Sequence, residues 1–514
     1  MNGAESLIDA LAEHGVDACF ANPGTSEMQL VAALDKQPRI RAVLCLFEGV
    51  VTGAADGYGR MADKPALTLL HLGPGFANGI ANLHNAQRAH SPILNMVGDH
   101  ATDHLQHDAP LTSDIRGLAT PVSQSFTVSP SADGLAQTGL QALSDSQRYP
   151  GAISTFVVPA DHAWTAIAPP VTRLSTIPTE RASDDTIAAV AQQLRDAPNS
   201  ALFLGGRALR AEALHQAGRI AAATGCRLIT ETFFARQARG AGRVVTERLA
   251  YFGEMAVEQL AGLDTLVLVG AKAPVSFFAY PDKPSVLSPA TASLSTLVNV
   301  RIDALDALTR LADLLNAPTQ PVTATAQTAH VLNHGKIDAN ELGKVVANRL
   351  PAQAIVCDEG ATNSLGTFLL TANAEPHDWL TLTGGAIGQG LPLAVGAAIA
   401  CPDRPVIALE ADGSGMYTVQ ALWTMVREQL DVTVLLLNNR SYAILNIELA
   451  RVGVEAPGPV ALSLLDLSNP DLSWADMARG MGLNASTVET VEALDQAFAA
   501  AMATKGPSLI EVML

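Results

Sequence analysis

Two polar clusters in the last third of the chain could bind a metal ion and a phosphate group. They are Asp412-Gly413-Ser414 and Asn438-Asn439, and each follows a run of aliphatic residues. The segment between them has the pattern of one helix, so the two runs can be neighbouring parallel strands. A carboxylate, an amide oxygen and a backbone carbonyl would then converge, and such hard oxygen ligands suit Mg²⁺. Gly413 and Ser414 would let a phosphate approach backbone N–H groups near a helix N-terminus.

A glutamate in the first part of the chain stands between a predicted strand and a predicted helix. Glu48 follows the apolar run at 41–47 and precedes a helical pattern at 49–61. An acid at a helix N-terminus is favoured by the helix dipole, which is a purely structural explanation. The same position also lies at a strand end, where α/β proteins bind their ligands. Glu48 is therefore a second candidate for chemistry.

Together these segments resemble the thiamine diphosphate-dependent enzyme superfamily. The segment from Asp412 to Asn439 is similar to the diphosphate motif of those enzymes, except that Ala411 replaces the usual first glycine. Glu48 and the Ala-Asp-Gly-Tyr-Gly-Arg sequence at 55–60 are similar to the pyrimidine-binding domain. The resemblance implies thiamine diphosphate and a divalent metal, expected to be Mg²⁺, as cofactors.

The resemblance also implies a role for individual residues. Asp412, Asn439 and the backbone oxygen of Ser441 would bind the metal. Glu48 would share a proton with a nitrogen of the aminopyrimidine ring, so that the amino group can take the proton from the thiazolium carbon. The backbone oxygen of Gly385 would accept from that amino group, and Ile387 would bend the cofactor. The full set of expected cofactor contacts is Glu48, Thr362, Asn363, Gly385, Ile387, Asp412, Gly413, Ser414, Asn439, Ser441, Tyr442, Ala443 and Ile444.

The first part of the chain is most similar to benzoylformate decarboxylase and its relatives. The segment 22–27 matches a strand-end loop with a substrate-contacting hydroxyl, and His71 stands where those enzymes have an active-site histidine that relays protons. The central segment 273–284 has two phenylalanines but no second histidine. We expect substrate contacts from Thr25, Ser26, His71, Phe277, Phe278 and Leu445, and catalytic roles for Glu48, His71 and Thr25.

The resemblance leaves three functions open. The leading one is decarboxylation of an aliphatic or aromatic 2-oxo acid, with carboligation of the product to an aldehyde or ketone. Without a second histidine, protonation after CO₂ loss would be slower, which gives time for carboligation. The second is an acetolactate synthase-like transfer between two 2-oxo acids, which a turn at 73–75 favours. The third is a catalytically silent regulatory or binding relative, which the presence of Glu48, Asp412 and Asn439 disfavours.

The elements that must position these residues alternate regularly. Short apolar runs and helical patterns form three blocks, which predicts parallel sheets with helices on both faces. Stretches rich in Pro, Thr and Ser at 167–183 and 316–335 separate the blocks. We therefore predict an α/β fold of three doubly wound parallel-sheet domains. These are a pyrimidine-binding domain at 1–170, a central Rossmann-like domain at 184–315 and a diphosphate- and metal-binding domain at 336–514.

Composition argues against several classes of partner. The chain has 514 residues, is 48% hydrophobic and carries a formal net charge of −18, which disfavours nucleic acid. No apolar run reaches the roughly 20 residues that span a bilayer, and the acidic N-terminal pattern is not that of a signal peptide. The five cysteines contain no CxxC pair, which suits a reducing compartment. We expect a cytoplasmic protein that binds neither nucleic acid nor membranes.

Two further expectations concern assembly and a flavin. The central block contains Leu204-Gly205-Gly206-Arg207 but no GxGxxG fingerprint, so FAD is not expected. In the family that the chain resembles, the pyrimidine domain of one subunit faces the diphosphate domain of another. The resemblance therefore implies a homodimer or a homotetramer.

Overall fold

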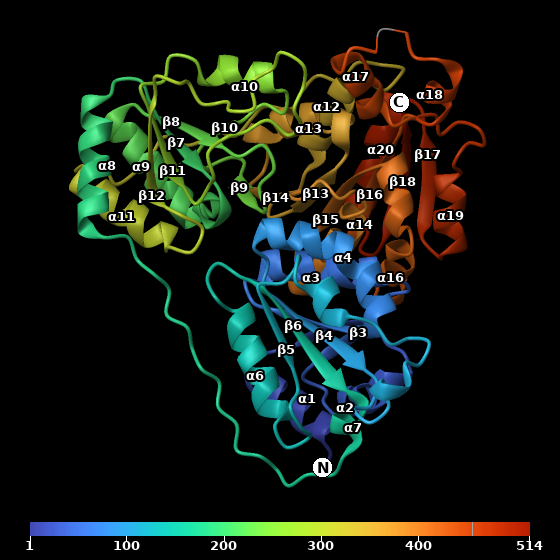
Figure 1. The fold of residues 1–514 in the computed structure, drawn as a ribbon. Helices are drawn as coiled ribbons and strands as arrows, with labels where there is room; N and C mark the ends of the chain where they lie inside the picture. The colour runs from blue at the N-terminus through green and yellow to red at the C-terminus, as the bar shows by residue number, and fades with distance from the viewer. Residues whose placement is uncertain (455) are drawn as a thin grey trace.

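The computed structural model describes residues 1–454 and 456–514 and contains three sheets (Figure 1). The first sheet is parallel and has the order β2-β1-β3-β4-β6-β5. Apolar cores lie on both of its faces, one with α3 and α4 and the other with α1 and α6. Its strands are β1 (Ala18–Asn22), β2 (Arg41–Leu44), β3 (Ala66–His71), β4 (Ile93–Asp99), β5 (Ser125–Val128) and β6 (Ile153–Pro159), and its helices are α1 (Gly3–Glu13), α2 (Met28–Asp35), α3 (Glu48–Ala62), α4 (Leu72–Ala89), α5 (Ile115–Ala119), α6 (Leu135–Ser146) and α7 (Ala160–Trp164).

The second sheet is also parallel and has the order β10-β8-β7-β11-β12. Its strands are β7 (Ser200–Leu204), β8 (Arg227–Thr230), β10 (Glu247–Arg248), β11 (Thr265–Val269) and β12 (Ser293–Val298), and its helices are α8 (Asp184–Asp196), α9 (Ala211–Thr224), α10 (Gly253–Leu260) and α11 (Ala304–Leu314). The described residues form no helix or strand from 165 to 183, and Figure 1 shows this stretch as a long trace between α7 and α8.

The third sheet has the order β17-β18-β16-β15-β13-β14-β9. Its strands are β9 (Gln237–Arg239), β13 (Ile355–Glu359), β14 (His377–Thr381), β15 (Val406–Ala411), β16 (Val432–Asn438), β17 (Asn484–Val488) and β18 (Ser508–Met513). Its helices are α12 (Ala339–Arg349), α13 (Leu365–Leu370), α14 (Gly390–Ala400), α15 (Asp412–Gly415), α16 (Ala421–Arg427), α17 (Ala443–Arg451), α18 (Pro459–Ser463), α19 (Trp474–Gly480) and α20 (Val491–Ala503).

The predicted α/β class with three parallel-dominated sheets is confirmed, with one exception. The edge strand β9 is antiparallel to β14 and comes from the segment between β8 and β10. Antiparallel edge strands are common on otherwise parallel sheets. A strand of three residues is too short to show an alternation of apolar and polar residues, so the sequence pattern does not predict it.

Helices α3 and α14 join the first sheet to the third. The two helices approach closely because Gly396 of α14 faces the backbone of α3. A Cβ added to Gly396 would lie 1.8 Å from the Ala54 carbonyl oxygen. A buried ion pair between Arg60 and Asp56 reinforces this contact, and Arg60 Nη1 also donates to the Thr381 carbonyl at 2.8 Å. The motif at 55–60 therefore builds the contact between the sheets.

No helix among the described residues is long and apolar enough to cross a membrane. All five cysteines are free, and four of them are buried.

Candidate active site

The first group of predicted residues lies at the carboxyl edge of the first sheet. Strands β1, β3 and β4 are neighbours, and His71, the last residue of β3, pairs in register with Gly98 of β4. Thr25 and Ser26 lie in a 3₁₀ turn, η1 (Thr25–Glu27), which follows β1. Thr25 is exposed and Ser26 is half-buried. Parallel strands end at the same edge, which is why segments distant in sequence meet here.

Glu27 holds His71 and is a residue that the sequence did not single out. Its Oε2 lies 2.7 Å from His71 Nδ1 and accepts from the Gly24 backbone N–H at 2.7 Å. The Glu27 side chain is fully buried, whereas 23% of the His71 side chain is exposed. Burial raises the pKa of Glu27, while the Gly24 N–H and His71 act in the opposite direction. The pair shares a proton, and His71 Nε2 is the ring nitrogen left to face a ligand.

Glu48 lies beside His71. A Cβ added to Gly75 would come within 3.1 Å of Glu48 Oε1 and within 3.3 Å of His71 Cβ, so both side chains border the same glycine. Asn78, on the next turn of α4, donates to Glu48 Oε2 at 3.0 Å. The structure thus brings together Thr25, Glu48 and His71 around the start of α4.

The predicted turn at 73–75 is wrong. These residues form the first turn of α4, which begins at Leu72. A proline is tolerated in the first helical turn because its missing N–H would have no intrahelical partner there.

The second group lies at the carboxyl edge of the third sheet. Strands β15 and β16 pair in register, so Asp412 and Asn439 follow neighbouring strand ends. Asp412 Oδ1 accepts from the Gly413 N–H at 3.0 Å, and its Oδ2 accepts from the Arg440 N–H at 2.7 Å. Asn439 Oδ1 accepts from the Ser441 N–H at 3.0 Å. These contacts hold the predicted ligand Asp412, after β15, against the turn after β16 that contains Asn439 and Ser441.

The chemistry of this turn fits a divalent cation. Asp412 is 1% exposed, and burial raises its pKa to about 6. It forms no ion pair with any residue at 1–454 or 456–514, so its charge lacks a cationic partner. The Ser441 carbonyl accepts no hydrogen bond within the same residues. A carboxylate, an amide oxygen and a free carbonyl are ligands that Mg²⁺ takes.

The turn at Gly384–Gly388, between β14 and α14, fits the role predicted for Gly385 and Ile387. Asn85 donates to the Ala386 carbonyl at 2.7 Å and accepts from the Ala386 N–H at 3.1 Å. Asn82 donates to the Gly388 carbonyl at 3.2 Å. Within the described part of the chain the Gly385 carbonyl accepts no hydrogen bond, so it is available to an amino group of a ligand. Ile387 is half-buried at this turn.

The remaining predicted contacts surround the Asp412 turn. Thr362 and Asn363 follow β13, the neighbour of β15, and Tyr442 precedes α17. A Cβ on Gly413 would collide with the Tyr442 ring at 2.4 Å, which explains the glycine. Ser414 uses its hydroxyl to bond Glu410 at 2.5 Å, so only its backbone N–H is left for a phosphate. Ala443, Ile444 and Leu445 form the first turn of α17, where Leu445 is 44% exposed.

The phenylalanine segment of the central block lies against α17. The Tyr280 hydroxyl donates to Glu448 of α17 at 2.5 Å. Phe277 stacks edge-on against Phe233 with ring centroids 5.0 Å apart, yet it stays 46% exposed, and Phe278 is 59% exposed. The two rings are therefore open apolar surface in the segment that contacts the second half of α17.

One chain does not bring the two groups together. No hydrogen bond or ion pair in the described structure links Thr25, Glu48 or His71 to the Asp412 turn. In Figure 1 the strand arrows of the first sheet point away from the third sheet, and α17 lies on the far side of the third sheet. The two groups of predicted residues, here called the two halves, lie at different places on one chain.

Two family descriptions match the two sheets that carry these halves. "Thiamine pyrophosphate enzyme, N-terminal TPP binding domain" matches residues 1–118, and "Thiamine pyrophosphate enzyme, C-terminal TPP binding domain" matches residues 358–512. The chain belongs to the thiamine pyrophosphate enzyme family. Its cofactor is thus thiamine diphosphate, with Mg²⁺ as the metal that is standard for this family.

Relatives of this thiamine pyrophosphate enzyme carry different reaction names. The chain is 48% identical to the "Putative acetolactate synthase large subunit IlvX" of Mycobacterium tuberculosis, over 100% of this chain and 99% of that protein. It is 28% identical to the benzoylformate decarboxylase of Pseudomonas aeruginosa, over 98% of this chain and 97% of that protein. The family is common to both, whereas the reaction is not.

Solved structures share the fold over the full length. The thiamine diphosphate-dependent 4-hydroxybenzoylformate decarboxylase of Rhodococcus jostii superposes with a TM-score of 0.88 at 24% identity, covering 100% of this chain and 99% of that one. The benzoylformate decarboxylase of Polynucleobacter necessarius superposes with a TM-score of 0.81 at 22% identity, covering 100% and 98%. At these identities the likeness establishes the fold alone.

Proposed function

We propose that this enzyme decarboxylates an apolar 2-oxo acid and can join the resulting group to an aldehyde or ketone. The observation that carries the proposal is the Glu27–His71 pair beside Glu48, because it places a proton carrier where decarboxylation needs one. The exposed Phe277 and Phe278 beside α17 favour an apolar substituent on the substrate.

We further propose that the complete site forms between two copies of the chain. Exposed apolar residues border both halves, with Leu46 at 48% beside Glu48 and Tyr417 at 55% in the turn that follows α15. Contiguous exposed apolar patches mark interaction surfaces, and a second copy of the chain could cover these residues. A second copy would set the edge with Glu48 against the edge with Asp412.

The residues of this chain would then divide the work. When bound, thiamine diphosphate supplies the electron sink for cleaving a carbon–carbon bond next to a carbonyl. Asp412, Asn439 and the Ser441 carbonyl would hold the metal and with it the diphosphate. Glu48, fixed by Asn78, would hold a proton at the pyrimidine ring, and the Gly385 carbonyl would accept from the amino group. His71 Nε2 would donate a proton to the product before its release, with Glu27 keeping the ring oriented.

An acetolactate synthase-like reaction is the second candidate, and the name of the 48% identical relative favours it. The test is product analysis of the purified enzyme with thiamine diphosphate, Mg²⁺ and a panel of aliphatic and aromatic 2-oxo acids. Aldehyde as the main product supports decarboxylation, whereas acetolactate from pyruvate alone supports the second candidate.

Glu48→Gln is the matched variant in this experiment. We expect it to bind the cofactor, since the metal turn is intact, and to lose activity by at least about 100-fold. Full activity in Glu48→Gln would contradict the assignment of this residue. Turnover of none of the acids by the cofactor-loaded wild type would overturn the proposed reaction.

A further inference from the structure

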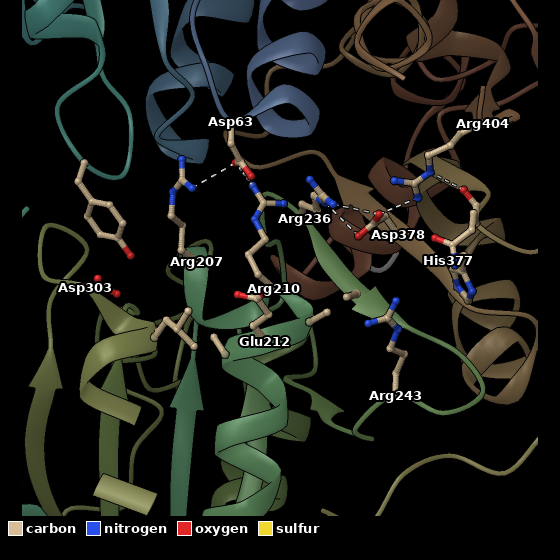
Figure 2. Close-up of a pocket in the computed structure, with 16 residues that line it drawn as sticks. Asp63, Arg207, Arg210, Glu212, Arg236, Arg243, Asp303, His377, Asp378 and Arg404 are labelled. Carbon is tan, nitrogen blue, oxygen red and sulfur yellow. Dashed lines mark hydrogen bonds and ion pairs between the residues drawn. The ribbon is translucent and has the colours of Figure 1, made fainter. Parts of the chain in front are cut away.

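A cavity of about 460 Å³ opens where the three sheets meet (Figure 2). None of its lining residues belongs to the candidate active site, so the proposed function does not explain it. The lining comes from all three parts of the chain: Asp63 follows α3, Arg207 and Arg210 follow β7, and Asp378 lies on β14. Five arginines line the cavity, namely Arg207, Arg210, Arg236, Arg243 and Arg404.

Two carboxylates in the cavity are each shared between two guanidinium groups. Asp63 Oδ1 lies 2.9 Å from Arg210 Nη2 and 3.3 Å from Arg207 Nη1. Asp378 pairs in the same way with Arg236 at 2.9 Å and with Arg404 at 2.7 Å. Figure 2 shows both bridges side by side on one wall. Each carboxylate neutralises only one of its two partners, so the wall carries excess positive charge.

Guanidinium groups without a partner among the described residues add to this excess of positive charge. Arg243 makes no side-chain hydrogen bond or ion pair with the residues that the structure describes, and it is only half-exposed. Arg210 Nε and Nη1 are buried and also have no partner there. Burial and the neighbouring Arg236 lower the pKa of Arg210 to about 9, which shows how poorly its charge is compensated.

The other carboxylates in the cavity reduce this charge but do not cancel it, because with Glu212 and Asp303 four carboxylates face five guanidinium groups. Glu212 is exposed, and Asp303 accepts from the Asp306 N–H at 3.1 Å as the N-cap of α11. Burial lowers the pKa of His377 to about 3, so His377 is neutral. The first residues of α9 also line the cavity, and no side chain caps this 14-residue helix. Its free N–H groups and dipole favour an anion at the same place.

We propose that this cavity binds a small organic anion through carboxylate or phosphate groups, and that Arg243 is its main free ligand. Guanidinium groups match both anions with paired N–H donors. A cavity of this size holds a metabolite-sized ligand, and the ligand would bridge the three parts of the chain. The site is separate from the cofactor site and goes beyond the proposed function.

The test is isothermal titration calorimetry on the enzyme loaded with thiamine diphosphate and Mg²⁺. The probes are inorganic phosphate and succinate, each at constant ionic strength set with chloride. We expect saturable binding of one anion per chain. Tighter binding of phosphate identifies a phosphate-bearing ligand, and tighter binding of succinate identifies a carboxylate; either result supports the site.

Arg243→Gln should weaken binding about tenfold or more, because a charge-assisted hydrogen bond is lost. The Arg243 side chain forms no hydrogen bond or ion pair with residues 1–454 or 456–514, so this variant should keep the melting temperature of the wild type. Arg173→Gln, which removes the same charge from an exposed position between α7 and α8, should bind like the wild type. Absence of saturable binding for both probes, or unchanged binding in Arg243→Gln, would overturn the proposal. Binding is read as heat, so an error in the proposed reaction would not affect this result.

Discussion

At the scale of single residues, the behaviour of a catalytic histidine depends on what its other ring nitrogen contacts. Here His71 Nδ1 is hydrogen-bonded to Glu27 Oε2 at 2.7 Å. Gly24 leaves room for the ring, because a Cβ added to Gly24 would lie only 2.3 Å from His71 Nδ1. The hydrogen bond to Glu27 fixes the orientation of the ring. Glu27 is therefore a positioning residue for His71.

Glu27→Gln should lower kcat/KM by about 10- to 100-fold, because the ring loses a charged partner. The shape of the pH–activity profile should also change, because the variant lacks the buried Glu27 carboxyl, whose pKa burial raises. The measurement is the pH–rate profile of the cofactor-loaded enzyme. Glu13→Gln is the control, because Glu13 is exposed at the C-terminal end of α1. An unchanged profile in Glu27→Gln would refute this role.

His377 should make the enzyme sensitive to acid. Its imidazole is 3% exposed, and burial lowers its pKa to about 3, whereas an unfolded histidine titrates near 6.5. Between these pH values the unfolded state binds more protons, so stability is complete above about 6.5 and falls as the pH decreases. The largest slope from one such group is about 1.4 kcal/mol per pH unit.

We therefore expect the melting temperature of His377→Gln to fall less between pH 6.5 and pH 5 than that of the wild type, as measured by calorimetry. His334→Gln is the control, because 89% of the His334 side chain is exposed. An equal fall in all three proteins would show that other groups cause the acid sensitivity.

At the scale of elements, one helix connects the two sheets near the site. Asn78, Asn82 and Asn85 follow one another on α4 at spacings of four and three, which places them on one face. Asn78 binds Glu48, and the other two hold the turn at Gly384–Gly388. The helix thus fixes both the Glu48 side chain and the Gly384–Gly388 turn between β14 and α14.

Asn85→Ala should weaken thiamine diphosphate binding about tenfold, because the Ala386 N–H and carbonyl lose their partners and the turn loosens. The measurement is cofactor affinity by tryptophan fluorescence at saturating Mg²⁺. Gln87→Ala removes an exposed amide of the same helix and should have little effect. Equal affinity in both variants would show that the turn keeps its shape without Asn85.

At the scale of the whole molecule, the two halves of the predicted site lie at different places on one chain, and we propose that they meet between two chains. A site assembled from two chains predicts complementation between two inactive variants. Glu48→Gln and Asp412→Ala should each be inactive alone. In a hybrid dimer, one site combines the intact Glu48 of one chain with the intact Asp412 of the other.

After subunit exchange, about a quarter of wild-type activity should return, because half of the dimers are hybrids and each has one intact site. The measurement is the activity of the mixed variants after dilution and reconcentration, with each variant treated alone as the control. No recovery, although exchange is seen with differently tagged chains, would place the whole site within one chain.

Much of the fold and cofactor chemistry could be predicted because it depends on local sequence. A strand-end motif such as Asp412-Gly413-Ser414 contains both the predicted ligand and the residues of the turn that positions it. Both can therefore be recognised in a short stretch of sequence. The alternation of apolar runs and helices likewise predicted the parallel sheets. Strand β9 could not be predicted, because its three residues are too few to show an alternating pattern. Its partner β14 is also distant in sequence.

The family, the three-sheet class and the candidate residues at strand ends could all be predicted, because each depends on a contiguous segment of the chain. Which of these residues meet depends on how distant segments pack. Glu27 reaches His71 because β1 and β3 are neighbours, and the arginines of the cavity converge because three sheets come together. Such contacts depend on the register of strands and the packing of helices, and these are set by side chains far apart in the chain.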